Sequence, residues 1–225
     1  MNNPVRALLG LSGFALVCAG LLGGIDYMTR ERIAENIEQA RKLKLLEVVG
    51  AVVAPPVEIG ELTLEGFGYA EPRTGHVIAQ DGAVRAYVLP VRAPDGYSGA
   101  IDLLVAVSPD AEPVVFGVRT VQHRETPGLG DGIERAKSDW ILSFDGATLE
   151  QPADWRVRRD GGDFDQLTGA TITPRAVVSA VHRALLQYRR QHGELQGRPV
   201  LWEDAGEDAG KDTGDNAGAA GAPRR

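Results

Sequence analysis

The chain has 225 residues, of which 43% are hydrophobic and 24% are charged. This composition is typical of a globular protein and excludes pervasive disorder, and the length allows one sizeable domain with extra segments. The formal net charge of −7 gives no support for a basic nucleic-acid-binding surface, so we expect no nucleic-acid partner. A single cysteine excludes a disulfide framework and a cysteine-rich metal site, so a redox role would require an organic cofactor or haem.

The longest uncharged stretch lies near the N-terminus, where 19 residues from Ala7 to Ile25 carry no charged side chain. As a helix it would be about 28 Å long, close to the hydrocarbon thickness of a bilayer. It is longer than the roughly 7–15 apolar residues of a cleaved signal peptide. We therefore predict that residues 1–27 form an uncleaved transmembrane anchor. Gly20 and Gly24 either let a second membrane helix approach closely or simply face lipid.

The charges on either side of this stretch bear on its orientation. Only Arg6 and the N-terminal amine precede it. Five basic residues follow it at a short distance: Arg30, Arg32, Arg41, Lys42 and Lys44. Because basic residues near a membrane span tend to stay in the cytoplasm, this count favours a cytoplasmic location for the C-terminal part of the chain.

Residues 28–56 are predicted to form a stalk helix followed by a linker. Apolar residues recur at helical spacing among charged ones, and they are Ile33, Ile37, Ala40 and Leu43. We expect this stripe to be a packing face, and we expect Pro55-Pro56 to end the segment.

Residues 57–122 contain short apolar runs separated by turn signals, which predicts an antiparallel meander. Asp81-Gly82 is a favourable two-residue hairpin turn, and Pro94-Asp95-Gly96 marks a second turn. The expected strands span residues 76–80, 84–90, 100–107 and 114–122.

The rest of the chain combines short elements with one long helix. A helical patch is expected near residues 132–138, then residues 140–144 and a strand at 155–159. Thr173 is a suitable N-cap and Pro174 a suitable first-turn residue for a helix that ends near residues 192–193. Its buried stripe is predicted to be Val177, Val178, Val181, Ala184, Leu185 and Tyr188. The expected fold class is therefore α+β, with a transmembrane helix followed by a twisted antiparallel sheet and packed helices.

The C-terminal tail, residues 201–225, is acidic and built mainly from Ala, Gly, Asp, Glu and Asn. It cannot bury enough apolar surface to fold, so we predict that it is disordered.

Common enzyme signatures are missing from the chain. It has no phosphate-binding loop with its lysine, no complete dinucleotide fingerprint and no nucleophile elbow. The four histidines show no metal-ligand spacing. A hydrolase or a nucleotide-driven enzyme therefore has little support.

Two polar, glycine-rich segments remain, and they span residues 123–130 and 165–174. The second places small residues and hydroxyls directly before a helix N-terminus, where free N–H groups and the helix dipole favour an anion. Gly169 also permits a close backbone approach. On the residues alone, this segment is either an anion site or a simple capping loop.

Asp165, Thr168, Gly169, Ala170 and Thr171 resemble the flavinylation motif of the FMN-binding domain family. The order of features over residues 5–190 also resembles the G-subunit family of Rnf-type ion-translocating electron transport complexes. Those features are the anchor, the Tyr97-Ser98-Gly99-Ala100-Ile101 run, the segment 123–130 and the threonine motif before a helix.

The resemblance implies that FMN is attached through its phosphate to the hydroxyl of Thr171, and that a flavin transferase makes this bond from FAD. Residues 57–200 would then be the FMN-binding domain. Asp165, Thr168, Gly169 and Ala170 would belong to the recognition motif, with Leu167 and Ile172 packing beneath it. The loop that faces the flavin would contain His123, Glu125, Thr126 and the backbone of residues 128–130.

The resemblance further implies an electron-transfer protein rather than a stand-alone catalyst. It would act within a complex that couples electron flow between NADH and ferredoxin to ion movement, beside other membrane, flavin and iron–sulfur subunits. It would be a single-pass protein of the bacterial inner membrane with its bulk in the periplasm, against the count of basic residues.

Three alternatives remain open. The first is the C-type flavoprotein component of a sodium-translocating NADH:quinone reductase, and the second is a non-redox anchored assembly module. The third is an independent flavin reductase, which the absence of a nicotinamide fingerprint disfavours.

Overall fold

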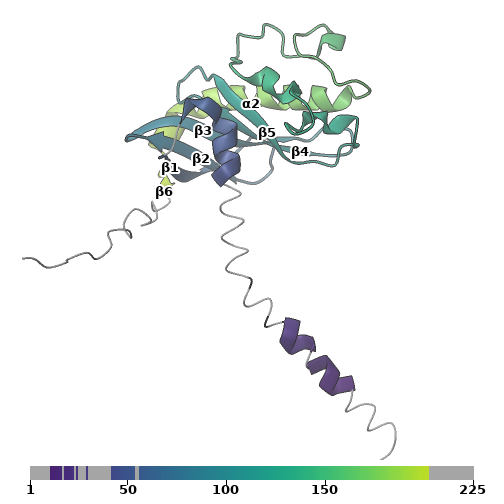
Figure 1. The fold of residues 1–225 in the computed structure, drawn as a ribbon. Helices are drawn as coiled ribbons and strands as arrows, with labels where there is room; N and C mark the ends of the chain where they lie inside the picture. The colour runs from purple at the N-terminus through teal and green to yellow at the C-terminus, as the bar shows by residue number, and fades with distance from the viewer. Residues whose placement is uncertain are drawn as a thin grey trace, which may run out of the picture.

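The computed structural model describes residues 11–16, 18–22, 24, 29, 42–53 and 56–202 (Figure 1). Its centre is one antiparallel sheet of six strands in the order β5-β4-β3-β2-β1-β6. The strands are β1 (Glu58–Leu64), β2 (Arg73–Gln80), β3 (Ala83–Ala93), β4 (Ile101–Val107), β5 (Val115–Gln122) and β6 (Leu201–Trp202). The remaining elements are α2 (Ile172–Gly197) and the 3₁₀ turns η1 (Gly50–Val52), η2 (Gly130–Ile133), η3 (Trp140–Phe144) and η4 (Arg158–Asp160).

The predicted meander is confirmed. Asp81 and Gly82 both have positive φ, 54° and 72°, as a type I′ hairpin turn requires between β2 and β3. Strands β4 and β5 follow with antiparallel pairing. The sequence did not predict β6, a two-residue strand that pairs with β1 at the sheet edge.

The strand predicted at residues 155–159 is wrong. Val157 makes one isolated bridge, to Phe164, and residues 158–160 form the 3₁₀ turn η4, outside the sheet. The reason is local packing. Trp155 and Phe164 lie with ring centroids 5.2 Å apart and both pack on Phe144 of η3, so this segment belongs to an irregular aromatic layer rather than to the sheet.

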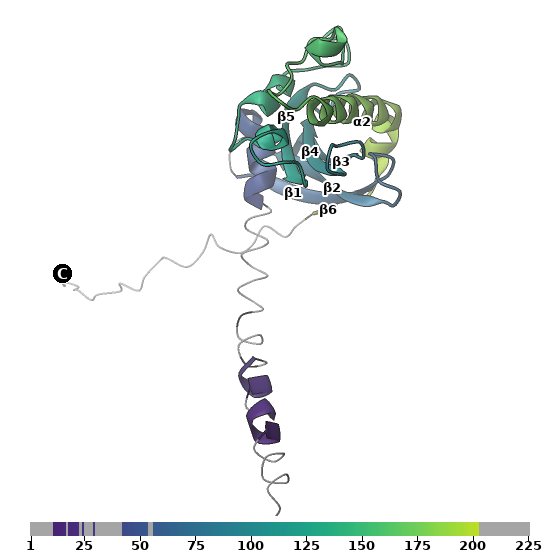
Figure 2. The ribbon, with the colours of Figure 1, turned by 90° about the vertical axis from the view of Figure 1, so that its right-hand side faces the viewer.

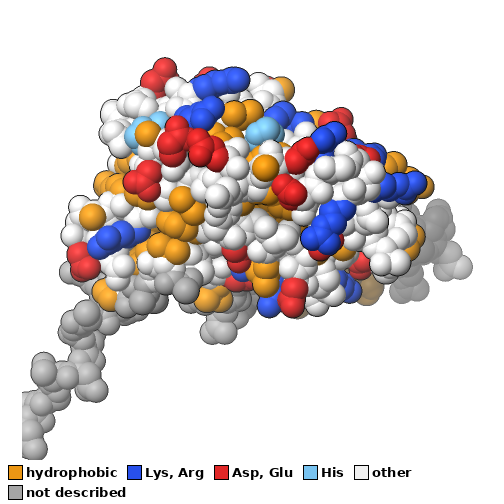
Figure 3. Space-filling model, turned by 90° about the horizontal axis from the view of Figure 1, so that it is seen from above, with side chains coloured by type: hydrophobic (Ala, Val, Ile, Leu, Met, Phe, Trp, Pro, Cys, Tyr) orange, Lys and Arg blue, Asp and Glu red, His pale blue; other side chains and the backbone are white. Residues whose placement is uncertain are grey.

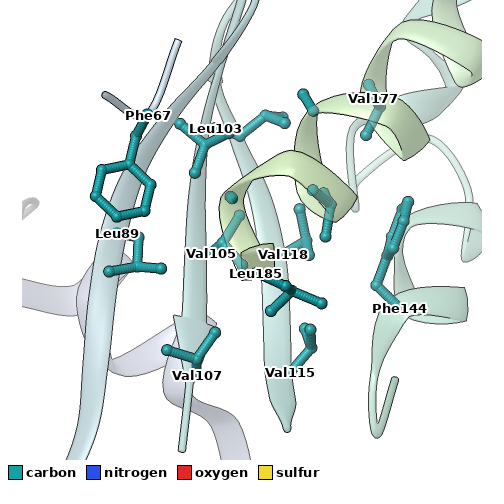
Figure 4. Close-up of a cluster of buried hydrophobic side chains, with 14 of the residues drawn as sticks. Phe67, Leu89, Leu103, Val105, Val107, Val115, Val118, Phe144, Val177 and Leu185 are labelled. Carbon is teal, nitrogen blue, oxygen red and sulfur yellow. The ribbon is translucent and has the colours of Figure 1, made fainter. Parts of the chain in front are cut away.

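Helix α2 covers one face of the sheet, and all six residues of its predicted stripe are buried. Figure 4 shows Leu185 of α2 beside Val105 of β4 and Val118 of β5, and Val177 belongs to the same cluster on the side of the helix toward Phe144. Tyr188 is also fully buried, and its hydroxyl donates a hydrogen bond to the carbonyl of Ser108 at 3.1 Å. Burial raises the pKa of this phenol.

The opposite face is covered by a short helix at residues 42–49. Its buried residues Leu45, Val48 and Val49 form a second core with Ile59, Ile78, Ala86, Val88 and Ala106 of the sheet. Side chains on a strand alternate between the two faces, so neighbours such as Val77 and Ile78 belong to different cores.

Of the packing face predicted for the stalk, Leu43 lies within the described residues; it is 68% exposed and does not join the second core, whereas Leu45 is buried there. Ile33, Ile37 and Ala40 lie outside the described residues.

The predicted anchor is described only in part. Residues 11–16, 18–22 and 24 are helical, and the apolar side chains of Leu11, Phe14 and Leu22 are well exposed. Among the described residues, no helix is both long enough and apolar enough to span a bilayer. Most of the predicted tail, residues 203–225, lies outside the described residues.

Figure 2 shows the irregular segment that follows β5 lying beside the N-terminal end of α2. The helix begins at Ile172 with Thr171 as its N-cap residue, two residues before the start predicted from Thr173-Pro174. This end of the helix is where the two polar segments meet.

Candidate functional site

A cleft of about 600 Å³ opens at the N-terminal end of α2. Its walls come from four parts of the chain: the β3–β4 connection, the loop after β5, turn η4, and the segment that leads into α2. The lining residues are Tyr97, Glu125, Thr126, Leu129, Gly130, Arg159, Gly169, Ala170, Thr171, Ile172, Thr173 and Arg175. The structure therefore brings together the two polar segments that the sequence singled out.

The segment before α2 enters the cleft through a tight turn. The backbone N–H of Ala170 donates to the carbonyl of Leu167 at 3.1 Å, and Gly169 has φ +79°, as the third position of a type II turn requires. A Cβ atom on Gly169 would lie 2.8 Å from Cδ2 of Leu129. Glycine is needed here both for its φ and for the close contact between the two segments.

Thr171 lies at the N-cap position of α2, yet its side chain makes no capping hydrogen bond. Its hydroxyl oxygen instead accepts a hydrogen bond from Nη1 of Arg159 at 3.1 Å. The residue is half-buried and lines the cleft. The hydroxyl is thus oriented toward a cation rather than toward the helix backbone.

Thr173 has a different role from the predicted N-cap. It lies inside the first turn of α2, is fully buried, and its hydroxyl donates to Oε2 of Glu125. The prediction failed because the helix already begins at Ile172. Thr173 therefore lies inside the first turn, and its hydroxyl binds a residue that is distant in the sequence. Thr168, the third threonine of the motif, is exposed and does not line the cleft.

Glu125 joins three walls of the cleft. It is only 4% exposed, and its second carboxylate oxygen, Oε1, accepts a hydrogen bond from the backbone N–H of Ser98 at 2.9 Å. A Cβ atom on Gly130 would approach both this carboxylate and the Thr173 hydroxyl to 2.9 Å. Both carboxylate oxygens are therefore satisfied by the protein, as a buried carboxylate requires.

Thr126 lines the cleft as expected, and its carbonyl accepts from the N–H groups of Leu129 and Gly130. His123 does not line it. Its Nδ1 accepts from the N–H of Glu125 at 3.1 Å, so Nε2 carries the proton and donates to Glu134 at 3.0 Å. His123 thus supports the loop from behind.

Asp165 also lies outside the cleft lining. Its carboxylate pairs with Arg158 at 2.7 Å, and its carbonyl accepts from Nε1 of Trp140 at 2.6 Å. These contacts anchor the start of the motif to η3 and η4.

The sequence missed three lining residues, Tyr97, Arg159 and Arg175. Tyr97 is part of a run noted for its resemblance, without a role in the site. Asp160 holds Arg175 through two hydrogen bonds of 2.6 and 2.8 Å, which keep the pKa of Asp160 below its usual range. The basic residues near Arg159 were a possible signal, but only the fold shows which of them reaches the cleft.

The expectation that Ile172 packs beneath the motif is wrong, because it is 44% exposed and lines the cleft. Leu167 does pack against the main core, which confirms the matching expectation.

Comparison with known proteins identifies the family. A sequence model of the FMN-binding domain matches residues 96–186, and a model of the RnfG N-terminal region matches residues 5–48. The G subunit of the ion-translocating oxidoreductase complex of Pseudomonas aeruginosa is 49% identical over 190 residues, which cover 82% of this chain and 88% of that protein. The chain belongs to the G-subunit family of ion-translocating oxidoreductase complexes.

A second family member, from Shewanella oneidensis, is 38% identical over 214 residues, which cover 90% of this chain and 98% of that protein. The crystal structure of Shewanella oneidensis NqrC covers 66% of this chain and 73% of that chain at 23% identity, with a TM-score of 0.45.

All residues that line the cleft lie within residues 96–186, the part of the chain that matches the FMN-binding domain model. These residues suit FMN in three respects. The volume is in the range of cofactor sites, and Tyr97, Leu129 and Ile172 provide apolar surface for a ring system. Arg159 provides a cationic group for a phosphate, and the start of α2 provides backbone N–H groups and the positive end of the helix dipole.

Proposed function

We propose that this chain is a membrane-anchored flavoprotein that relays electrons through FMN bound covalently to Thr171. It would act within an ion-translocating complex that couples NADH and ferredoxin chemistry to ion movement. The observation that carries the proposal is the Thr171 hydroxyl, which faces the cleft and Arg159 instead of capping α2.

The three motif threonines differ in how well they suit attachment. Thr173 is fully buried, and its hydroxyl is already engaged with Glu125. Thr168 is exposed outside the cleft. Of the three, Thr171 combines a cleft-facing hydroxyl with a neighbouring cation, so it is the attachment residue we propose.

Attachment balances as a group transfer. A bond forms between Oγ1 of Thr171 and the flavin phosphorus of FAD, the pyrophosphate bond breaks, and AMP and the hydroxyl proton leave. A flavin transferase is the proposed catalyst of this step. The linkage leaves the ring system free for electron transfer in one- or two-electron steps, which is the chemistry that bound FMN supplies.

The chain's own residues would then position the cofactor. Glu125 and Thr126 shape the loop wall, and Gly169 and Ala170 let the backbone approach the phosphate. Asp165 and Thr168 would belong to the surface that the transferase recognises, and His123 would hold the loop in place.

The proposed function also includes a location in the cell and a set of partner proteins. Residues 1–27 would anchor the protein in the bacterial inner membrane, with the FMN-binding domain in the periplasm. A covalent bond prevents loss of the cofactor to a compartment where free flavin is scarce. Partners would be the other membrane, flavin and iron–sulfur subunits of the complex.

Intact mass and in-gel flavin fluorescence test the attachment. The full chain is made with a flavin transferase, alongside Thr171→Ala, Thr171→Ser and Thr168→Ala. We expect wild type to gain the mass of FMN minus water and to fluoresce after denaturation, Thr171→Ala to show neither signal, and Thr171→Ser to keep partial loading. Thr168→Ala should load less, without losing the linkage.

Two outcomes would contradict the proposal. Loading of Thr171→Ala would show that another hydroxyl is used. A wild type that never gains mass would favour the non-redox assembly module, in which the threonine loop is only the start of a helix.

A further inference from the structure

Turn η4 contacts the threonine motif and the first turn of α2 with three consecutive residues. Arg158 pairs with Asp165 at 2.7 Å, Arg159 donates to the Thr171 hydroxyl at 3.1 Å, and Asp160 accepts from Arg175 at 2.6 and 2.8 Å. The turn therefore holds the segment from its first residue to the first turn of α2. Its middle residue is the one directed at the proposed attachment atom.

The arginines on this turn and at the start of α2 are not equally compensated. Arg158 and Arg175 each pair with a carboxylate. Within the part of the chain that the structure describes, no carboxylate lies within salt-bridge distance of Arg159. Arg159 therefore brings a guanidinium without a salt-bridge partner to the wall of the cleft, where only a longer-range interaction with the carboxylate of Asp160 offsets its charge.

The face shown in Figure 3 mixes Lys and Arg side chains with Asp and Glu rather than presenting one continuous basic field. Recognition of an anion in the cleft then depends on individually placed groups. A guanidinium can bind two phosphate oxygens with parallel hydrogen bonds, which an ammonium group cannot do.

We propose that Arg159 is the phosphate-binding residue of this cleft, and that it makes the site selective for phosphorylated flavin over riboflavin. The proposal rests on the proposed function, since the bound phosphate is the one to be joined to Thr171. Arg159 would hold the non-bridging phosphate oxygens beside the Thr171 hydroxyl. Arg175, fixed by Asp160, would add a second cation on the same wall.

The first test measures covalent loading. The full chain and its Arg159→Gln and Arg159→Lys variants are incubated with purified flavin transferase and FAD, and loading is followed by intact mass. We expect Arg159→Gln to slow loading roughly tenfold to a hundredfold, the range for a lost charge-assisted hydrogen bond. Arg159→Lys should be intermediate, because it keeps the charge and loses the forked geometry.

The matched control is Arg156→Gln. Arg156 lies in the same segment, is exposed, pairs with Asp154 and does not line the cleft. It removes the same charge at a distance from the site, so it should load like wild type. An equal loss in both arginine variants would overturn the assignment to Arg159.

The second test needs no transferase. Binding of FMN and of riboflavin to the unloaded full chain is measured by flavin fluorescence. Wild type should prefer FMN by about tenfold or more, the difference that one charge-assisted phosphate contact provides. Arg159→Gln should lose this preference while riboflavin binding stays unchanged.

The two proposals fail in different ways. If wild type loads and Arg159→Gln loads equally fast, or if wild type binds both flavins equally, the phosphate role of Arg159 is wrong and the Thr171 attachment stands. If wild type never loads, the attachment itself is wrong, and the FMN preference still decides the role of Arg159.

Discussion

At the scale of single residues, the cleft depends on side chains that contact distant parts of the chain. Thr173 and Glu125 are separated by 48 positions and are both buried, and each satisfies the other's hydrogen-bonding group. Gly169 and Leu129 meet because one of them has no side chain. Substitutions at these positions should act through the partner as well as through the residue itself.

Thr173→Val tests the buried pair. Valine keeps the shape of threonine but cannot donate to Glu125, so a buried carboxylate oxygen loses its partner. We expect a loss of about 1–3 kcal/mol in the free energy of unfolding, the cost of an unsatisfied buried group. The measurement is denaturant unfolding of the full chain in detergent. Thr173→Ser keeps the hydroxyl and should lose clearly less; equal losses would argue against this hydrogen bond.

Gly169→Ala tests the turn. Its φ of +79° disfavours any residue with a Cβ atom, by about 1–2 kcal/mol, and the new methyl group would also press on Leu129. We expect a lower midpoint of thermal unfolding. Gly193→Ala is the matched control, because Gly193 lies in α2 with open space around it and should gain about 0.5–1 kcal/mol. If Gly193→Ala lowered the midpoint as much as Gly169→Ala, the loss at Gly169 could not be assigned to its positive φ.

At the scale of elements, the sheet has two different covers. Helix α2 packs along one face and begins at the cleft, while residues 42–49 pack on the other face. Turn η4 is the smallest element at the cleft, yet it links the aromatic layer around Trp155 to the start of α2. The position of the cleft therefore depends on how α2 is fixed against both the sheet and this turn.

Two leucines of one helix test the second cover. Leu45 is 1% exposed and belongs to the core, whereas Leu43 is 68% exposed. We expect Leu45→Ala to lower the free energy of unfolding by about 2–5 kcal/mol, as for other buried leucines. Leu43→Ala should stay within about 0.5 kcal/mol of wild type. Denaturant unfolding distinguishes them, and similar effects would mean that residues 42–49 do not pack on the sheet in solution.

At the scale of the whole molecule, two lines of reasoning give opposite orientations for the predicted membrane anchor. The basic residues after the predicted span favour the cytoplasm for the C-terminal part. The resemblance to the family implies the periplasm. These basic residues lie among acidic ones in a mixed-charge segment, and packing against partner proteins of the complex can outweigh a modest charge bias.

A reporter fused after Arg225 decides between the two arguments. We expect a phosphatase reporter, which folds only in the periplasm, to be active, and a cytoplasm-dependent fluorescent reporter to be dark. The same fusions on a chain that lacks residues 1–27 provide the control for export. Activity of the fluorescent fusion alone would show that the basic-residue count was the correct guide.

Features that depend on neighbouring residues along the chain could be predicted from the sequence. The turn at Asp81-Gly82, the strands on either side of it and the apolar stripe of α2 follow from local backbone preferences and periodicity, and the structure has all of them. The threonine motif before a helix was also visible, because each of its residues stands beside the next. Family membership followed from these short patterns and agrees with the relatives found by comparison.

Which residues share the cleft depends on long-range packing and could not be predicted from the sequence. Residues 155–159 begin with an alternation of apolar and basic residues that suits a strand, but the aromatic packing around Phe144 makes them a support for turn η4. Arg159 then reaches Thr171 across 12 positions, while Asp165 and His123 turn away to Arg158 and Glu134. Such contacts join segments with no regular spacing along the chain, so periodicity and local propensity carry no information about them. They follow from how the irregular layer packs against the sheet and the first turn of α2.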